Sequence, residues 1–572
     1  MGRVNPIMTP FWLGLWSFTL GVGWLLPNHY WPWLSFHTDA WVASVLLLAT
    51  VAIVFRSQGT FVWNRITLLA TLLLFVPWVQ YFFGIVPLVG NAWISSAYLL
   101  GFLLAMLAGA RWESNAPGQF ANGLFLAVGI AAIVSVGLQL KQWLVLDGLE
   151  LWTMGGGVQR PSANLGQPNQ LGTLLLWGVL STGWGVIHKR IGVWVALLMA
   201  TYLLFGIALT GSRTAGIGVA LLVAAFWFWR HLWDSGRLPW VATALGLFYV
   251  FCVVGVGWLQ IAPQVDAQSL EPALADFART NVEIRPTAWA AFIDAVWRSP
   301  FFGYGWNQGV LAQVSVSVEH PELHGVFRYS HNLFLDLILW CGVPLGGLIS
   351  IALAWWLFKR LRAVQSSENA LLALFLLVIA NHAMLELPLY FAYFLLPVGM
   401  VMGVLNTRLA ARPLFSLGRG VALGLSVATT IFLGLIIRDY SRVEESYLTL
   451  RFEEQGIQTS SPKEPPDVLL LTQWRDYIYY ARFEPKAGLT KDELDWMGNV
   501  TGLFPTAGFF QKYSMALALN QRPAEASLWL QRMSKMVPEA QCLILKKTWA
   551  RQSMNIPEIA AIPWPVEVGK CK

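Results

Sequence analysis

The chain of 572 residues is 56% hydrophobic and only 12% charged, and it contains 31 tryptophans. This composition excludes a soluble globular protein, which has no use for so much apolar surface, and it predicts a polytopic membrane protein of the all-α class. The net charge of +7 is explained by basic residues in the loops on one side of the membrane, so it does not indicate a nucleic-acid partner.

Long apolar runs with few charges predict the membrane-spanning helices. In chain order they predict about thirteen spans, at residues 11–26, 40–55, 66–83, 91–109, 119–141, 169–187, 191–209, 213–229, 240–260, 332–357, 369–383, 389–405 and 420–437. The first run lacks a small-residue cleavage site and is followed by many more, so we interpret it as a membrane anchor and not as a cleaved signal peptide.

The basic residues predict the orientation of these spans. They gather in one set of alternating loops, whereas the opposite short loops 27–39, 84–90 and 384–388 contain no Lys or Arg. By the positive-inside rule the basic loops are cytoplasmic. An odd number of spans then places the N-terminus inside, and the chain after Ile437 outside.

A large loop at 261–330 lies on the outer side in this topology. Its sequence is amphipathic, because Trp289, Ile293 and Val296 fall on one face of a predicted helix. We expect this helix to lie on the membrane surface and to cover the helix bundle.

The outer C-terminal segment, 438–572, has the composition of a soluble helical domain. Residues 504–520 and 523–533 predict a helix-turn-helix pair of tetratricopeptide type. The predicted domains are therefore a transmembrane domain, 1–437, and this outer C-terminal domain, 438–572.

The four cysteines follow the same layout. Cys252 and Cys341 fall in apolar spans, where a thiol packs as a small hydrophobic group. Cys542 and Cys571 fall in the outer domain, where an oxidising compartment permits a disulfide. The sequence does not decide whether that bond forms.

Polar residues gather at the outer ends of the spans. They occur in the loop 155–172, in the short turn 210–216, in the hairpin 381–393 and at the start of the span 332–357. These positions supply Arg160, Gln167, Asn169, Gln170, Arg213, His331, Asn332, His382, Glu386, Tyr390 and Tyr393.

Taken singly, most of these residues have a purely structural interpretation. Arg213 can reach the headgroups, Arg285 can belong to a surface helix, and the amides of the first loop can form a turn and a helix cap. Glu386 requires a partner in an apolar hairpin, and His382 lies four residues before it. Their coincidence on one face predicts a functional site.

The residue types in this site favour an anionic, lipid-linked substrate. Guanidinium groups bind diphosphate oxygens bidentately and stay charged, and the imidazole of His331 can take up a proton near neutral pH. The chain has no phosphate-binding P-loop and no His-Glu-x-x-His zinc motif. His320 and His324 could bind a metal, but they lie in a proline-interrupted loop, and we expect no metal site.

The motifs resemble those of a known family. Ser330-His331-Asn332-Leu-Phe-Leu, Gly211-Ser212-Arg213-Thr and Pro168-Asn169-Gln170 look like the O-antigen ligase and polymerase superfamily of bacterial envelopes. The hairpin from His382 to Pro397 is similar to the branch of PglL-type protein O-oligosaccharyltransferases.

This resemblance implies an enzyme of the bacterial inner membrane. It would transfer a glycan from undecaprenyl diphosphate to Ser or Thr hydroxyls of periplasmic or pilin-like proteins, without a metal or another cofactor. His331 matches the residue that activates the acceptor hydroxyl, and Arg213 and Arg285 match the arginines that hold the diphosphate.

The resemblance also implies a set of substrate-binding residues. Gln170 or Gln167 matches the family's loop glutamine, and Tyr393 or Tyr390 matches its hairpin tyrosine. The other polar residues expected to contact the substrates are Asn169, Arg160, Glu386, His382 and Asn332.

Three other functions remain open at this stage. An O-antigen ligase would use the same donor and lipid A-core as the acceptor, and an O-antigen polymerase would extend the glycan. A lipid or solute transporter would place its polar residues near the bilayer midplane and would contain inverted repeats. We find the cluster at one face and no obvious repeat, which disfavours transport.

Overall fold

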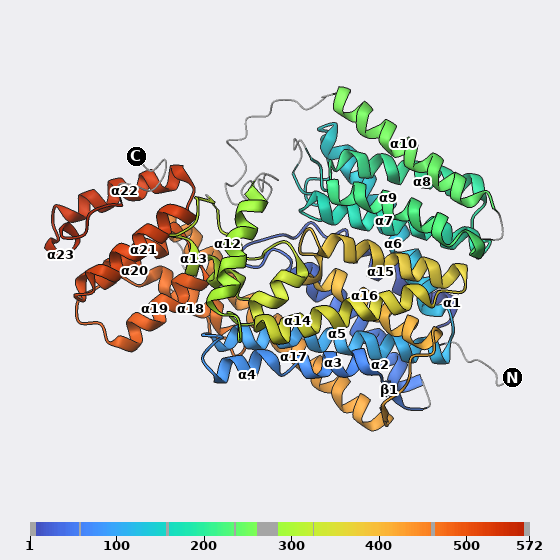
Figure 1. Ribbon diagram of the computed structural model, residues 1–572, viewed down its shortest axis with the longest axis horizontal. Coiled ribbons are helices and arrows are strands. Elements are labelled where there is room, and N and C mark those ends of the chain that lie inside the picture. The colour runs from blue at the N-terminus through green and yellow to red at the C-terminus, as the bar shows by residue number, and fades with distance from the viewer. Residues whose placement is uncertain are drawn as a thin grey trace. The chain divides into compact units, whose positions relative to one another are not determined.

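The computed structural model describes residues 7–56, 59–155, 160–233, 236–259, 284–323, 325–458 and 464–565 (Figure 1). Within these residues the chain is almost entirely helical. The two strands found there, β1 (Phe61–Trp63) and β2 (Phe415–Leu417), form one short antiparallel pair. The all-α class predicted from the composition is confirmed.

The chain divides into two compact units. The first unit contains Met1–Leu73, Tyr98–Ser269 and Ala352–Gly434, and the second contains Leu74–Ala97, Leu270–Ile351 and Leu435–Lys572. Three long helices have residues in both units: α5 (Val89–Asn115), α14 (Leu333–Arg362) and α17 (Arg419–Glu454).

The first unit holds most of the apolar helices. They are α1 (Pro10–Val22), α2 (Phe36–Arg56), α3 (Arg65–Leu73), α6 (Gln119–Trp143), α7 (Pro168–Ile187), α8 (Val193–Leu209), α9 (Arg213–Phe228), α10 (Leu238–Leu259), α15 (Ser367–Ala383) and α16 (Ala392–Arg408). Short 3-10 turns, η1 (Arg230–Leu232) and η2 (Pro388–Tyr390), follow α9 and precede α16.

The second unit combines α4 (Val76–Phe82) with the helices of the large loop and of the C-terminal segment. These are α12 (Ile284–Arg298), α13 (Gly309–Val316), α18 (Thr472–Arg482), α19 (Lys491–Leu503), α20 (Ala507–Leu519), α21 (Pro523–Met536), α22 (Glu539–Ser553) and α23 (Pro557–Ala560). The helix pair predicted at 504–520 and 523–533 corresponds to α20 and α21, which pack against each other.

Every predicted span coincides with a helix. Among the described residues, eight helices are long and apolar enough to cross a membrane, and α8, α9 and α15 are shorter apolar helices. The span expected at 66–83 consists of α3 and α4, which are separated at residues 74–75. The chain is therefore a multi-pass membrane protein.

Helix α7 is the centre of the first unit, where it packs against α6, α8, α9 and α15 (Figure 1). The Trp177 ring is fully buried and stacks on the Phe375 ring, with centroids 3.8 Å apart, and its indole N–H donates to the Phe375 carbonyl. Gly172 lies against Ala215 of α9, and any larger side chain would separate the two helices.

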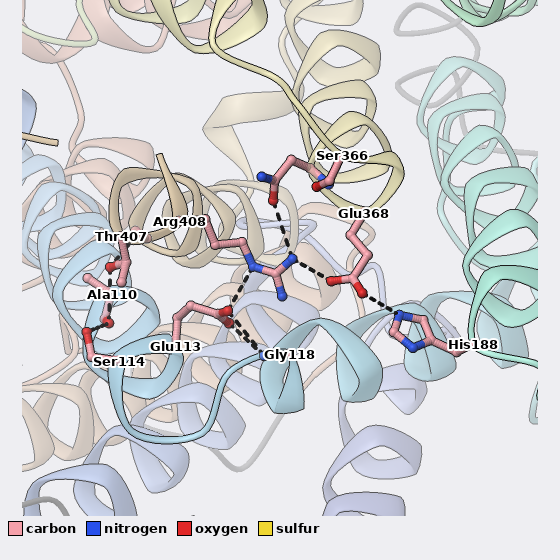
Figure 2. A network of polar contacts seen from close by, with 11 residues as sticks. Ala110, Glu113, Ser114, Gly118, His188, Ser366, Glu368, Thr407 and Arg408 are labelled. Carbon is pink, nitrogen blue, oxygen red and sulfur yellow. Dashed lines mark hydrogen bonds and ion pairs between the residues drawn. The ribbon is translucent and has the colours of Figure 1, made fainter. Parts of the chain in front are cut away.

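A partly buried network of ion pairs and hydrogen bonds ties together the ends of five helices, α5, α6, α7, α15 and α16 (Figure 2). Arg408, the last residue of α16, places its Nε 2.8 Å from Glu113 Oε1 and its Nη1 2.7 Å from Glu368 Oε2. Glu113 also accepts from the Gly118 N–H, and His188, after α7, lies 3.5 Å from Glu368. Because Glu113 is 4% exposed, it requires this partner, and the network fixes this end of the bundle.

Helix α12 forms within the segment for which an amphipathic helix was predicted. Ala288, Ala291, Phe292, Ala295 and Val296 are buried. Ile293 is 50% exposed and Trp297 is 71% exposed, so α12 also carries large apolar side chains that the described residues do not cover. Its placement on the membrane surface stays a prediction.

The cysteines behave partly as expected. Cys252 and Cys341 are buried free thiols. Cys542 is disulfide-bonded. Cys571, the partner expected for it, lies outside the described residues.

Candidate functional site

The predicted site residues fall into two groups, one in each unit. Arg160, Gln167, Asn169, Gln170, Arg213, His382, Glu386, Tyr390 and Tyr393 belong to the first unit, and Arg285, His331 and Asn332 belong to the second.

In the first unit, a chain of hydrogen bonds connects α16 to the start of α7. The Tyr393 hydroxyl donates to Gln170 Oε1 at 2.7 Å, and Gln170 Nε2 donates to Gln167 Oε1 at 3.1 Å. Tyr393 and Gln170 are buried, whereas Gln167 is half-buried. Gln167 is the N-cap residue of α7, but its side chain does not cap the helix. The side chains of Gln167 and Gln170 therefore form a hydrogen-bond chain, and the helix-cap interpretation does not account for them.

Beside this chain, Asn169 joins the hairpin between α15 and α16. Its Nδ2 donates to Glu386 Oε1 at 2.9 Å, and Arg160 Nη2 donates to its Oδ1 at 3.4 Å. We expected His382 to be the partner of Glu386. Instead, His382 Nδ1 lies 2.7 Å from the Thr173 hydroxyl inside the bundle, and Asn169 donates to the carboxylate.

Two arginines flank the turn between α8 and α9. Arg160 Nε donates to the Thr210 carbonyl at 3.0 Å, and Arg213 is the exposed first residue of α9. Ser212 caps α9 by accepting from the Ala215 N–H at 3.1 Å, and Gly211 provides the left-handed residue of the turn. A helix N-terminus with two guanidinium groups beside it suits an anion such as a diphosphate.

Asp39 was missed by the sequence analysis. It lies in the first turn of α2, is 5% exposed and accepts hydrogen bonds from Ser35 and Tyr98, and from the backbone N–H groups of Ala392 and Tyr393. The available signal was a carboxylate inside an apolar span, which always needs partners.

In the second unit, His331 occupies a strained turn directly before α14. Its φ is +58°, a left-handed conformation that is rare for residues with a side chain. Asn332 caps α14 by accepting from the N–H groups of Phe334 and Leu335, at 3.1 and 3.2 Å. Before the histidine, the Ser330 N–H donates to the buried Asp336 carboxylate at 2.7 Å. The backbone is thus fixed on both sides of His331, and its ring is half-exposed.

Helix α12 is connected to the same turn. The Trp289 indole N–H donates to the Ser330 carbonyl at 2.7 Å. Arg285 lies four residues earlier, one helical turn along the same face, and is half-buried. The helix that carries Arg285 therefore also holds the residue next to His331.

Helix α14 is interrupted at Gly342, and the contacts made at this interruption hold its first turns in place. Gly342 has φ +76° and ψ 170°, which interrupts the helix. The freed carbonyls are bonded by another segment: the Leu339 carbonyl accepts from the Tyr304 N–H at 2.7 Å, and the Trp340 carbonyl accepts from the Gly305 N–H and from Gln80 Nε2. The helix that follows His331 is thereby fixed to the segment that follows α12.

The segment before His331 packs against the C-terminal helices of the second unit. The Arg328 guanidinium lies 5.8 Å from the centre of the Phe504 ring, between α19 and α20. Val310 and Val314 of α13 belong to the same hydrophobic core as α19, α20 and α21. The C-terminal helices and the segment leading to the histidine share one core.

No group of three or more His, Cys, Asp or Glu side chains within the described ranges is arranged to hold a metal ion. Of the alternative pair, His320 Nε2 lies 2.8 Å from Asp294 Oδ2. His324 lies outside the described residues.

Comparisons with known proteins show which families the chain resembles. Three family models match the chain: "Protein glycosylation ligase" at residues 161–184, "O-Antigen ligase" at residues 198–350 and "Virulence factor membrane-bound polymerase, C-terminal" at residues 370–550. A protein of Acinetobacter baylyi named "General O-oligosaccharyltransferase" is 30% identical over 532 residues, which cover 90% of this chain and 91% of that protein. A second protein of that species, named "ComP-specific O-oligosaccharyltransferase", is 24% identical over 339 residues, 59% of this chain and 60% of that protein.

Proposed function

This chain belongs to the family of O-oligosaccharyltransferases, which are membrane glycosyltransferases, and from that premise we propose that it moves a glycan from undecaprenyl diphosphate to Ser or Thr hydroxyls of periplasmic or pilin-like proteins. The chain would lie in the bacterial inner membrane. The site and the C-terminal helices would face the periplasm, as the distribution of basic residues indicates.

The proposed reaction is a direct displacement. The acceptor oxygen attacks the anomeric carbon of the glycan, the bond from that carbon to the diphosphate oxygen breaks, and the configuration inverts. The hydroxyl proton passes to the imidazole of His331, and the bond's electron pair leaves with the diphosphate. A positioned histidine typically accelerates such a step by about a hundredfold to ten-thousandfold.

The arginines would stabilise the charge that develops on the diphosphate. Arg213 stands at the N-terminus of α9, and Arg285 stands on α12, the helix that holds the His331 turn. Preorganised charged donors of this kind lower the barrier because they need little rearrangement during the reaction. Gln167, Gln170 and Tyr393 would orient the donor.

The observation that carries the proposal is the backbone at His331. A left-handed residue with a side chain costs about 1–2 kcal/mol, and such strain concentrates at functional sites. Asn332 supplies the helix cap, so capping alone gives no reason for a histidine at the strained position. The turn presents a half-exposed imidazole between two fixed peptide groups, as a catalytic base requires.

The C-terminal domain, 438–572, would bind the acceptor polypeptide. Paired helices commonly offer concave peptide-binding surfaces. Supporting this role, these helices share a core with α13 and contact Arg328, three residues before His331.

The test is transfer in a host that makes a lipid-linked glycan but lacks its own ligase. The chain is expressed as wild type, as His331→Ala and as His320→Ala, and mass spectrometry locates the glycan. We expect it on Ser or Thr of periplasmic proteins with the wild type and with His320→Ala, and we expect it to be absent with His331→Ala. His320 is the matched control, because it is a histidine of the same loop and pairs with Asp294.

Two results would contradict the proposal. Glycan found on lipid A-core alone would make the chain an O-antigen ligase, the activity named by the family model matched at 198–350. Protein glycosylation that persists in His331→Ala at the wild-type rate would remove the histidine from the mechanism.

A further inference from the structure

Asp39 is a buried carboxylate with four hydrogen-bond donors around it. Oδ2 accepts from the hydroxyls of Ser35 and Tyr98, each at 2.7 Å. Oδ1 accepts from the backbone N–H groups of Ala392 and Tyr393, at 2.5 and 3.3 Å. All four partners donate, which is the environment of an ionised, acceptor-only group.

The two backbone donors are the first N–H groups of α16. A helix leaves its first N–H groups without partners inside the helix, and a side-chain acceptor normally supplies them. The N-cap residue of α16 is Phe391, which has no such acceptor. Asp39 of α2 takes its place from a different helix, and its negative charge is favoured at this end of the helix dipole.

The position of α16 determines where the polar chain of the site begins. Tyr393 is the second residue of α16, and its hydroxyl donates to Gln170, which donates to Gln167. Each bond fixes the direction of the next one. Since the Gln167 oxygen accepts from Gln170, the amide that Gln167 presents at the half-buried end of the chain is the N–H donor.

We propose that Asp39 is a positioning residue for the transfer reaction. It fixes the first turn of α16, so that Tyr393, acting through Gln170, turns the Gln167 amide N–H toward the oxygens of the lipid-linked diphosphate donor. This inference rests on the proposed function of the site.

The test is a double-mutant cycle between Asp39 and Tyr393, in purified full-length protein with a lipid-linked glycan donor. Asp39→Ala and Tyr393→Phe are each expected to lower kcat/KM for the donor by about 10²-fold, since a misplacement near 1 Å can cost that much. If Asp39 acts through Tyr393, kcat/KM of the double variant lies no more than about threefold below that of the less active single variant. A residue that only stabilises the fold would instead give losses that multiply.

A second variant covers the case in which Asp39→Ala does not fold. Asp39→Asn keeps an oxygen for the backbone N–H groups, and the hydroxyls of Ser35 and Tyr98 can accept from its amide. We expect roughly a tenfold loss for Asp39→Asn, which disappears in the Tyr393→Phe background.

The matched control is Glu113→Gln. Glu113 is also a buried carboxylate and holds the other end of α16 through Arg408, ~22 Å from Tyr393 along the helix axis. This variant is expected to lower the Tm while leaving kcat/KM per folded molecule unchanged.

Three results would each overturn the role of Asp39. They are single-variant losses of kcat/KM that multiply to about 10⁴-fold in the double variant, a loss of kcat/KM in Glu113→Gln equal to that in Asp39→Ala, or full activity of Tyr393→Phe. Failure of the proposed function is a different result, because in that case the wild type itself places no glycan on protein.

Discussion

The strain at His331 can be measured by replacing the histidine with Gly and with Ala. Both variants lack the imidazole, but only Gly adopts φ +58° without a steric penalty. The left-handed conformation costs a residue with a Cβ about 1–2 kcal/mol, and the greater backbone entropy of Gly in the unfolded chain offsets about 0.5–1 kcal/mol of that gain. We therefore expect His331→Gly to be more stable than His331→Ala by about 1 kcal/mol, while both lose glycan transfer.

The assay combines thermal unfolding in one detergent with the transfer assay. A difference of about 1 kcal/mol corresponds to ~2–4 °C in Tm for a folded unit of about 240 residues, the size of the second unit. Lys189, at φ +53° between α7 and α8, is the matched control: Lys189→Gly should exceed Lys189→Ala in Tm by the same margin, with transfer unchanged in both. Equal Tm values for the two His331 variants would refute the strain, and full transfer by either would refute the role of the imidazole.

Three further predictions concern the supports of the site and the fold. Trp289→Phe removes the indole N–H that donates to the Ser330 carbonyl, next to His331, so stability should fall by about 1–3 kcal/mol and transfer should fall at least tenfold. Gly342→Ala places a Cβ against the Phe301 carbonyl at a left-handed position and should prevent accumulation of monodisperse protein, whereas Gly347→Ala, where a Cβ meets open space, should express normally. Burial lowers the pKa of His29, so the folded state favours its neutral form; stability is full above pH ~6.5 and decreases as the pH falls below that value, and the Tm of His29→Asn should depend less on pH over this window.

The sequence predicts the helices well because their determinants are local. A run of apolar residues long enough to cross the bilayer has few alternatives to a helix, since every backbone group in lipid needs a partner within its own segment. The cap at Asn332 and the basic run from Lys359 to Arg362 are likewise local signals, and the structure begins α14 directly after Asn332 and ends it at Arg362.

The contacts between distant segments could not be predicted in this way. Asp39 meets α16 more than 350 positions later in the chain, and its partners there are peptide N–H groups, which carry no sequence signal. The sequence likewise does not show that the φ of Gly342 is positive or that Tyr304 replaces the lost helical bond. The partner of Glu386 was predicted four residues away in the same hairpin, whereas the donor observed is Asn169, which tertiary packing brings near.

The interruption of α14 gives neighbouring residues opposite tolerance to substitution. Residues 300–305 are bonded to the helix through peptide groups: Tyr304 and Gly305 donate to its carbonyls, and the Pro300 carbonyl accepts from Val343. The side chains of Phe301 and Phe302 are each 70% exposed and take no part in these hydrogen bonds. We therefore expect the fold to accept other side chains at these two positions, whereas a Cβ at Gly303 or Gly342 would collide with the peptide groups of the facing segment.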